Sequence, residues 1–242
     1  MKVIKLDAID STNDFLKGLS NQEVLENFTV VTAENQTNGK GQMGNSWQSE
    51  VGKNLIMSVL VKGFIASVNE VFNLNCVVSI SIVQALEEMN IPKLSVKWPN
   101  DIMSDNKKIG GVLIENTIKS DKTISSVVGL GLNINQTNFD LLPNASSLKV
   151  IHNSDFDKEK ILSSIIEKMK NNINLWNLDS NLIWSNYTNK LFKKEIVMSF
   201  IDKKGVSFLG IIKGVSSIGK LQIELENRSI AEFDFKEIQM IY

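Results

Sequence analysis

The string Lys97-Trp98-Pro99-Asn100-Asp101, followed closely by Lys108-Ile109-Gly110-Gly111, decides how this chain is interpreted. Residues 94–98 predict a strand, which Pro99 ends because proline cannot donate to a central ladder. A carboxylate such as Asp101 at a strand end can hold Mg²⁺, bond a ribose hydroxyl or accept a proton from an amine. Pro-Asn-Asp is also a frequent turn sequence, so this string alone leaves both interpretations open.

Of two further predicted strands, the one at residues 109–115 carries Gly110 and Gly111, and the one at residues 124–130 ends in Gly129 and is followed by Gly131. Glycines at the start of a strand often mark the close approach of a ligand or another backbone, and Lys108 at the entrance could neutralise a phosphate. The alternative is a solvated lysine beside a β-bulge. The second strand runs into Gly129-Leu130-Gly131-Leu132-Asn133, and a polar turn at residues 119–121 is expected to join the two strands.

The glycine-rich segment Gly39-Lys40-Gly41-Gln42-Met43-Gly44 lies in a predicted loop over residues 35–53. A dinucleotide-binding loop of this spacing requires a helix directly afterwards, whereas a strand at residues 55–61 is predicted here. The His-Arg-Asp and Asp-Phe-Gly signatures of protein kinases are absent. Either an anion-binding loop, with backbone N–H groups and Lys40 as donors, or a plain hairpin loop remains.

The rest of the chain predicts alternating strands and helices, then a change of texture after residue 190. Further expected elements are strands at residues 3–6 and 28–32, a helix capped by Asp10 or Ser11, a buried helix at residues 71–89 and an amphipathic helix from Asp157. Short strands near residues 196–200, 209–213, 221–225 and 231–235 predict a small antiparallel barrel. We therefore place a domain boundary near residue 189.

The composition of the 242 residues excludes several classes of protein. With 26 Lys+Arg, 27 Asp+Glu and a net charge of -1, general binding to nucleic acid or anionic membrane is not expected. One histidine and one cysteine exclude a Cys/His zinc site and a disulfide framework. Asp7 and Asp10 argue against a signal peptide, and no apolar run is long enough to span a bilayer, so a cytoplasmic protein is expected.

In this order, the motifs resemble those of the biotin–protein ligases (biotin–[acetyl-CoA-carboxylase] ligases). The resemblance covers nearly the whole chain and rests on these segments: Asp10-Ser11-Thr12-Asn13, Ala33-Glu34-Asn35-Gln36, Gly39-Lys40-Gly41 with Trp47, Lys97-Trp98-Pro99-Asn100-Asp101, Lys108-Ile109-Gly110-Gly111 with Glu115, and Val128-Gly129-Leu130-Gly131-Leu132-Asn133. It implies an α/β catalytic domain related to class II aminoacyl-tRNA synthetases over residues 1–189. It also implies an SH3-like β-barrel over residues 190–242.

The resemblance implies a ligase that activates biotin with ATP and Mg²⁺ to biotinyl-AMP. Biotin then passes to a lysine of a biotin carboxyl carrier domain. Because the carboxylate of biotin is already an anion, the scarcity of histidine is no obstacle. The single arginine, Arg228, lies in the predicted barrel, so Lys108, Lys40 and Mg²⁺ would have to supply the positive charge around the phosphates. A homodimer is compatible with the family, and binding to DNA or a membrane is not expected.

The resemblance also implies a role for each motif residue. Those expected to bind biotin are Ser11, Thr12, Asn13, Gln36, Gly39, Trp47, Lys108, Gly111 and Gly131. Those expected to bind ATP are Lys40, Gly41, Asn54, Asn100 and Asn133. The expected catalytic residues are Lys108, Asp101 and Lys40, with Asp101 also the expected metal ligand and the group that handles the carrier lysine.

One segment departs from the family, and two alternatives stay open. Family members commonly carry several arginines in the glycine loop, where this chain has Lys40, Gln42, Met43 and Asn45. Because lysine binds phosphate less specifically than arginine does, we expect weaker static retention of the adenylate and more reliance on loop closure.

The nearest alternative is a lipoate/octanoate–protein ligase. A biotin-responsive transcriptional repressor is disfavoured because the Ser-Thr-Asn motif begins at residue 11, which leaves no room for an N-terminal DNA-binding domain.

Overall fold

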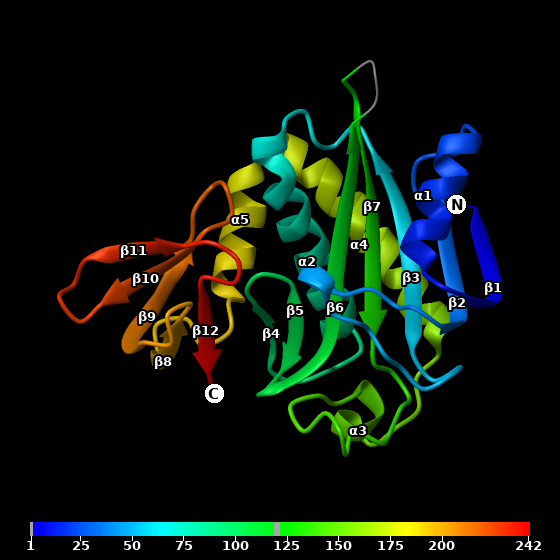
Figure 1. The fold of residues 1–242 in the computed structure, drawn as a ribbon. Helices are drawn as coiled ribbons and strands as arrows, with labels where there is room; N and C mark the ends of the chain where they lie inside the picture. The colour runs from blue at the N-terminus through cyan, green and yellow to red at the C-terminus, as the bar shows by residue number, and fades with distance from the viewer. Residues whose placement is uncertain (1, 119–121) are drawn as a thin grey trace.

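A seven-stranded mixed sheet forms the larger part of the computed structural model, which describes residues 2–118 and 122–242 (Figure 1). Its strands are β1 (Val3–Ile9), β2 (Val30–Gln36), β3 (Leu55–Lys62), β4 (Leu94–Lys97), β5 (Asp101–Ser104), β6 (Lys107–Ile118) and β7 (Ile124–Leu132). The spatial order is β1-β2-β3-β7-β6-β5-β4. Strands β1 and β2, which the helix α1 (Thr12–Gln22) connects in sequence, pair in parallel. The other described strand pairs of this sheet are antiparallel. The turn expected at residues 119–121 lies outside the described residues.

Both faces of this sheet are covered, as the alternation of apolar side chains along its strands requires. Leu16 of α1 packs on one face, in a cluster with Val31, Leu60 and Val127. The residues next to these in sequence, such as Val30 and Val59, point to the opposite face and join the main core. The sheet therefore separates a small cluster under α1 from a large core.

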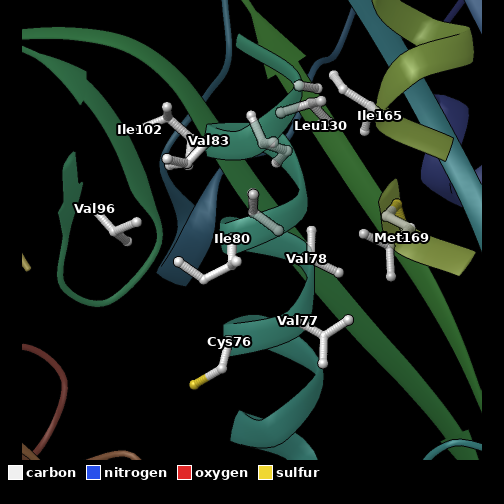
Figure 2. Close-up of a cluster of buried hydrophobic side chains, with 14 of the residues drawn as sticks. Cys76, Val77, Val78, Ile80, Val83, Val96, Ile102, Leu130, Ile165 and Met169 are labelled. Carbon is white, nitrogen blue, oxygen red and sulfur yellow. The ribbon is translucent and has the colours of Figure 1, made fainter. Parts of the chain in front are cut away.

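Helix α2 (Val71–Glu87) runs through the centre of the large core, between the sheet and helix α4 (Lys158–Leu178) (Figure 2). Val96 and Ile102 of the sheet lie on one side of it, and Ile165 and Met169 of α4 lie on the other. Helix α5 (Ser180–Asn189) also packs against α2 and α4. This enclosure explains why α2 is apolar on most faces, and it confirms the buried helix that the sequence predicts.

The C-terminal part is a separate five-stranded antiparallel sheet in the order β11-β10-β9-β8-β12. Its strands are β8 (Val197–Asp202), β9 (Ser207–Val215), β10 (Leu221–Leu225), β11 (Ile230–Phe233) and β12 (Ile238–Ile241). This sheet fits the predicted SH3-like unit, although β11 and β12 are its two edges and do not pair with each other in the described residues. The boundary near residue 189 coincides with the end of α5 and stays a prediction.

Several elements differ from the sequence prediction. Strand β2 continues to Gln36, because its polar end pairs with β1 through Ala8–Asn35 and Ile9–Gln36, so residues 35–36 are not loop. The short strand β5, helix α5 and the last strand β12 were not predicted, because each is short or carries several polar residues. The short helix α3 (Leu148–His152) was also not predicted. No helix among the described residues is long and apolar enough to cross a membrane.

Candidate active site

A cavity of about 320 Å³ opens between the large sheet, the glycine-rich segment and the C-terminal sheet. Most of the residues singled out from the sequence line it: Ser11, Thr12, Asn13, Gln36, Lys40, Gly41, Trp47, Asn100, Asp101, Lys108, Gly111 and Gly131. These residues come from segments up to about half the chain apart. The structure thus brings the predicted motifs to one place.

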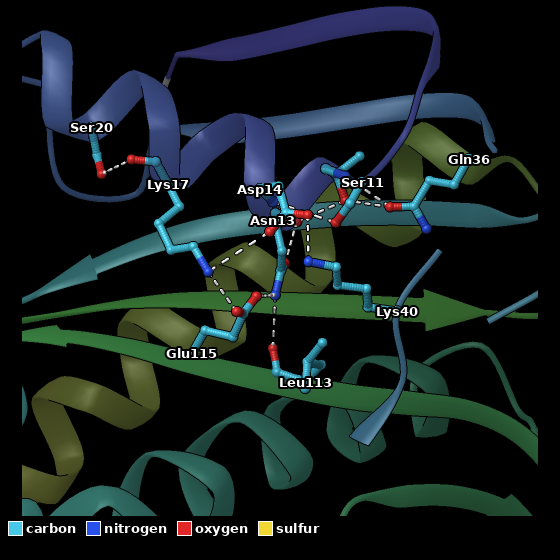
Figure 3. Close-up of polar contacts among 11 residues, drawn as sticks. Ser11, Asn13, Asp14, Lys17, Ser20, Gln36, Lys40, Leu113 and Glu115 are labelled. Carbon is cyan, nitrogen blue, oxygen red and sulfur yellow. Dashed lines mark hydrogen bonds and ion pairs between the residues drawn. The ribbon is translucent and has the colours of Figure 1, made fainter. Parts of the chain in front are cut away.

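The start of α1 forms the polar wall of the cavity (Figure 3). Ser11 caps the helix by accepting a hydrogen bond from the Asp14 N–H. Thr12 donates from its backbone N–H to Gln36 Oε1 at 2.8 Å, and its hydroxyl lies 3.1 Å from the same oxygen. Asn13 donates to Glu115 Oε2 at 2.9 Å. Each of these side chains is therefore held in a fixed orientation before any ligand arrives.

Ser58 of β3 holds this wall from below, and the sequence analysis did not identify it. Its Oγ lies 2.7 Å from Thr12 Oγ1 and 2.6 Å from Asn13 Oδ1, and the residue is fully buried. Because an amide oxygen only accepts, the Ser58 hydroxyl donates to Asn13 and is left to accept from Thr12. The signal in the sequence was a lone serine inside the apolar run at residues 55–61.

The floor of the cavity is a patch of sheet without side chains. Gly111 of β6 and Gly131 of β7 are directly paired across the two strands. A Cβ atom at Gly131 would lie 2.2 Å from Trp47 Cε2, so only glycine lets the indole lie on this floor. Trp47 Nε1 is buried and has no hydrogen-bond partner among the described residues, although a buried indole N–H usually finds one. The cavity therefore has an apolar slot lined by the Trp47 indole, whose buried N–H has no partner among the described residues.

Gly129 of β7, two residues before Gly131, lies equally close to the polar wall. A Cβ there would lie 2.4 Å from Asn13 Oδ1. Asn13 can approach the sheet and bond Ser58 only because this position is glycine. This requirement was not assigned from the sequence, although Gly129 belongs to a quoted motif.

Lys108 and Asp101 form an ion pair at the cavity, with Lys108 Nζ 2.6 Å from Asp101 Oδ1. The pairing of β5 with β6 shifts from Ile102–Gly110 to Met103–Lys108, so one extra residue lies in β6 and a bulge turns Lys108 toward the site. Lys108 Nζ also lies 5.9 Å from the centre of the Trp47 ring. A bulge and a lysine that faces the cavity, which the sequence left as alternatives, thus occur together.

Asn100 and its neighbours are fixed by the hairpin between β4 and β5, which contains a cis Trp98–Pro99 bond. Asn100 donates from its side chain to the Val112 carbonyl at 2.6 Å. Trp98 Nε1 donates to the Gly219 carbonyl of the C-terminal sheet at 2.9 Å. The Asn-Asp pair is thus part of a rigid turn and also lies at the cavity, so the two interpretations of this string do not conflict.

Lys40 is held by helix α1, with its Nζ 2.6 Å from Asp14 Oδ2 (Figure 3). The hydrogen bond with Asp14 is the main reason that the pKa of Lys40 is raised, and the charge of Glu115 adds to it. Lys40 therefore keeps its positive charge, and an incoming anion would have to compete with Asp14 for it.

Three predicted residues do not line the cavity. Gly39 accepts a hydrogen bond from the Trp47 N–H at 2.8 Å, at the base of the glycine-rich segment. Asn54 accepts from the Ile134 N–H and donates to Gln136. Asn133 donates to the Ser146 carbonyl at 3.0 Å. The two asparagines are buried and hold the segment after β7, and their roles toward ATP stay predictions.

The far side of the cavity is formed by the C-terminal sheet, which the sequence analysis did not associate with the site. Its contributors are Phe200, Leu221, Phe235, Lys236, Ile238, Gln239 and Met240. Phe235 lies against Trp98 with ring centres 5.1 Å apart. The C-terminal unit therefore completes the cavity that the predicted motifs line.

Comparison with known proteins agrees with this arrangement. Residues 6–133, more than half of the chain, match the profile of the "Biotin/lipoate A/B protein ligase family". The chain belongs to this family. All residues predicted for the site fall within the matched region, and the family assignment made from the motifs is confirmed.

Individual family members resemble the chain over most of its length. The bifunctional ligase/repressor BirA of Bacillus subtilis is 27% identical over 237 residues, which cover 90% of this chain and 72% of that protein. The biotin–[acetyl-CoA-carboxylase] ligase of Mycobacterium tuberculosis is 23% identical over 204 residues, or 83% of this chain and 75% of that protein.

Among solved structures, the biotin protein ligase of Aquifex aeolicus in complex with biotin and ATP superposes with a TM-score of 0.80. It is 25% identical, and the match covers 99% of this chain and 98% of that chain. The fold predicted for both parts of the chain is confirmed by this likeness.

Proposed function

We propose that this chain is a biotin–protein ligase that forms biotinyl-AMP from biotin and ATP and then transfers biotin to a carrier lysine. The observation that carries the proposal is the single cavity that joins the fixed polar wall, the Trp47 slot over bare glycines and the Lys108–Asp101 pair. The names and ligands of similar proteins, which include biotin and ATP, support the same activity.

The polar wall and the slot suit the bicyclic ring of biotin. A ureido group offers two N–H donors and one carbonyl acceptor, and the wall offers hydroxyl and amide groups from Ser11, Thr12 and Gln36. The apolar face of the biotin ring would pack against Trp47, whose indole lies on the glycine floor. Hydrogen bonds with Ser58 and Gln36 already hold these groups in place, so little side-chain freedom has to be lost on binding.

In the first step, a carboxylate oxygen of biotin attacks the α-phosphorus of ATP. A bond forms between this carboxylate oxygen and the α-phosphorus, which gives a mixed anhydride. The bond between the α-phosphorus and the oxygen that bridges to the β-phosphorus breaks, and pyrophosphate leaves with the electron pair of that bond. No proton has to be removed from the nucleophile. Lys108 and Lys40 would stabilise the negative charge that gathers on the phosphoryl oxygens.

Mg²⁺ fits this site only together with the substrate. No group of three or more His, Cys, Asp and Glu side chains that could hold a metal occurs in the described part of the chain. Mg²⁺ is commonly held by one or two carboxylates plus substrate phosphates, and Asp101 is the carboxylate that lies at the cavity. When bound with ATP, Mg²⁺ would supply further positive charge to the phosphates.

In the second step, the carrier lysine attacks the carbonyl carbon of the anhydride. An amide bond forms and AMP leaves. The reference pKa of a lysine is about 10.4, so the ammonium has to lose a proton first. Asp101 would orient it and accept that proton; this role is supported by the position of its carboxylate at the cavity, where it already bonds one ammonium, that of Lys108.

The direct test is mass spectrometry of a biotin carboxyl carrier domain incubated with the protein, biotin and Mg-ATP. The proposal expects the mass of one biotinyl group on one lysine. Lipoate and octanoate serve as controls, since the matched family includes both kinds of ligase. Transfer of lipoate but not biotin would replace this proposal with the alternative. A cytoplasmic location stays a prediction from the sequence, which does not define the oligomeric state.

A further inference from the structure

The glycine-rich segment folds as a small hairpin beside the cavity, here called the glycine hairpin (residues 39–47). Gly41 donates to the Asn45 carbonyl at 2.7 Å and Trp47 donates to the Gly39 carbonyl at 2.8 Å. Met43 lies at the tip, with backbone angles φ 54 and ψ 38, and is 54% exposed. Because the tip is exposed, its own packing does little to fix its position over the cavity.

Besides the packing of Trp47 on Gly131, two polar contacts attach the glycine hairpin to the rest of the molecule. Near its base, Lys40 pairs with Asp14 of α1. At its tip, Lys236 Nζ donates to the Met43 carbonyl at 2.8 Å. Lys236 lies just before β12 in the C-terminal sheet, and it lines the same cavity as Met43. The two attachments therefore join the hairpin to opposite ends of the chain.

The charge on Lys236 is not neutralised by a carboxylate. Of the cavity lysines, Lys40 and Lys108 are ion-paired, and Lys97 bonds Tyr242. Lys236 makes no ion pair within residues 2–118 and 122–242. An ammonium has three N–H groups, and one bond to Met43 leaves two. Lys236 can thus hold the hairpin tip while it still faces an anion in the cavity.

We propose that Lys236 is a positioning residue that holds the glycine hairpin closed over the bound biotinyl-adenylate. The inference rests on the proposed function for the identity of the ligand, and on the Lys236–Met43 contact for the mechanism. The glycine hairpin has no arginine of its own, so closure depends on contacts made from outside it. The C-terminal sheet thereby controls how long the reactive intermediate is retained.

Two substitutions separate the hydrogen bond from other effects. Lys236→Met keeps the length of the side chain but removes the donor, whereas Lys236→Arg restores a cationic donor. Lys236 has a φ of 62, and these replacements carry a similar backbone cost because none is glycine. The matched control is Lys213→Met, which removes a lysine of the same sheet that pairs with Glu195 and lies outside the cavity lining.

The measurement is the dissociation rate of biotinyl-AMP that the protein has formed from biotin and Mg-ATP, after removal of free substrates. Loss of one net hydrogen bond corresponds to about a three- to tenfold change, so we expect release from Lys236→Met to be faster by about that factor. Lys236→Arg and Lys213→Met should release at close to the wild-type rate. Amide hydrogen exchange at residues 41–45 should also be faster in Lys236→Met, even without substrates.

The outcomes distinguish this inference from the proposed function. If the wild-type protein forms no biotinyl-AMP, the proposed function is wrong, and the exchange comparison still decides whether Lys236 holds the hairpin. If the wild type forms the adenylate and Lys236→Met releases it at an unchanged rate, the inference is overturned. Faster release from Lys213→Met as well would overturn it too, because the effect would then belong to the sheet in general.

Discussion

Gly131→Ala should weaken biotin binding while it leaves the fold intact. The added Cβ would lie 2.2, 2.6 and 2.7 Å from three atoms of the Trp47 indole. Ordinary contact for such a carbon begins near 3.4 Å, so the ring has to move away from the floor by about 1 Å or more. Trp47 belongs to the glycine hairpin rather than to the core, so the hairpin shifts instead of the sheet.

The expected size follows from the contact area. An aromatic side chain buries about 150–250 Å², so one face contributes roughly 80 Å², and at about 25 cal/mol per Å² its loss costs about 2 kcal/mol. This corresponds to about a 30-fold weaker affinity for biotin. The melting temperature should change little, since alanine in place of a strand glycine gains about 0.5–1 kcal/mol and no core contact is lost.

The assay is the dependence of pyrophosphate exchange on biotin concentration, with thermal unfolding measured on the same samples. Gly18→Ala is the matched control, because a Cβ at Gly18 has no atom within 4 Å, and it should bind biotin normally. Trp47→Ala should weaken binding too, and adding Gly131→Ala to it should have little further effect. A wild-type KM for biotin in Gly131→Ala, or fully additive losses in the double variant, would refute the argument.

Three further predictions concern the polar groups of the site. Lys108→Ala should reduce carrier biotinylation by at least about 100-fold with an unchanged melting temperature. Lys107→Ala, which replaces the exposed lysine next to it, should stay active. Activity near wild type in Lys108→Ala would show that Lys108 does not have the assigned role. Ser58→Ala should lower the free energy of unfolding by about 1–3 kcal/mol and raise the KM for biotin, because it leaves the buried amide oxygen of Asn13 without its donor. Denaturation and kinetic assays that show both values unchanged would contradict the idea that Ser58 preorganises the polar wall. Asp14 raises the pKa of Lys40, so this pair stabilises the protein below the ordinary pKa of lysine, and the contribution is lost as the pH rises through the raised pKa. Alkaline unfolding of Asp14→Asn should therefore begin at lower pH than that of wild type. Identical unfolding profiles would show that the pair does not contribute.

The sequence predicted the motifs of the site better than the contacts that hold them. Lys108, Asp101 and Trp47 were assigned through the resemblance of their motifs to the family, and all three line the cavity. Ser58 was missed because a single serine in a buried strand has no pattern of its own, and its function depends on the partners that folding brings to it. Asn54 was assigned to the nucleotide; the structure shows its bond to the backbone at Ile134, and its role toward ATP stays a prediction.

The fold was predicted best where apolar periodicity is long. Helix α2 and strand β3 follow from nearly continuous buried patterns, since the helix is enclosed on most sides and the strand lies inside the sheet between β2 and β7. The contribution of the C-terminal sheet to the cavity could not be predicted, because no local pattern places Lys236 beside Met43, which is 193 residues away in sequence. Such contacts are set by how the two sheets pack.

The measurement that tests the central claim most directly is biotin-dependent exchange of labelled pyrophosphate into ATP, without any carrier protein. The cavity is lined by Trp47 and by the charged residues that we assign to adenylate formation, Lys40, Lys108 and Asp101. The purified protein should therefore catalyse exchange with biotin and Mg-ATP and not with lipoate or octanoate. Lys108→Ala should abolish it. A folded protein that exchanges no pyrophosphate with biotin, or exchanges it only with lipoate or octanoate, would contradict the account.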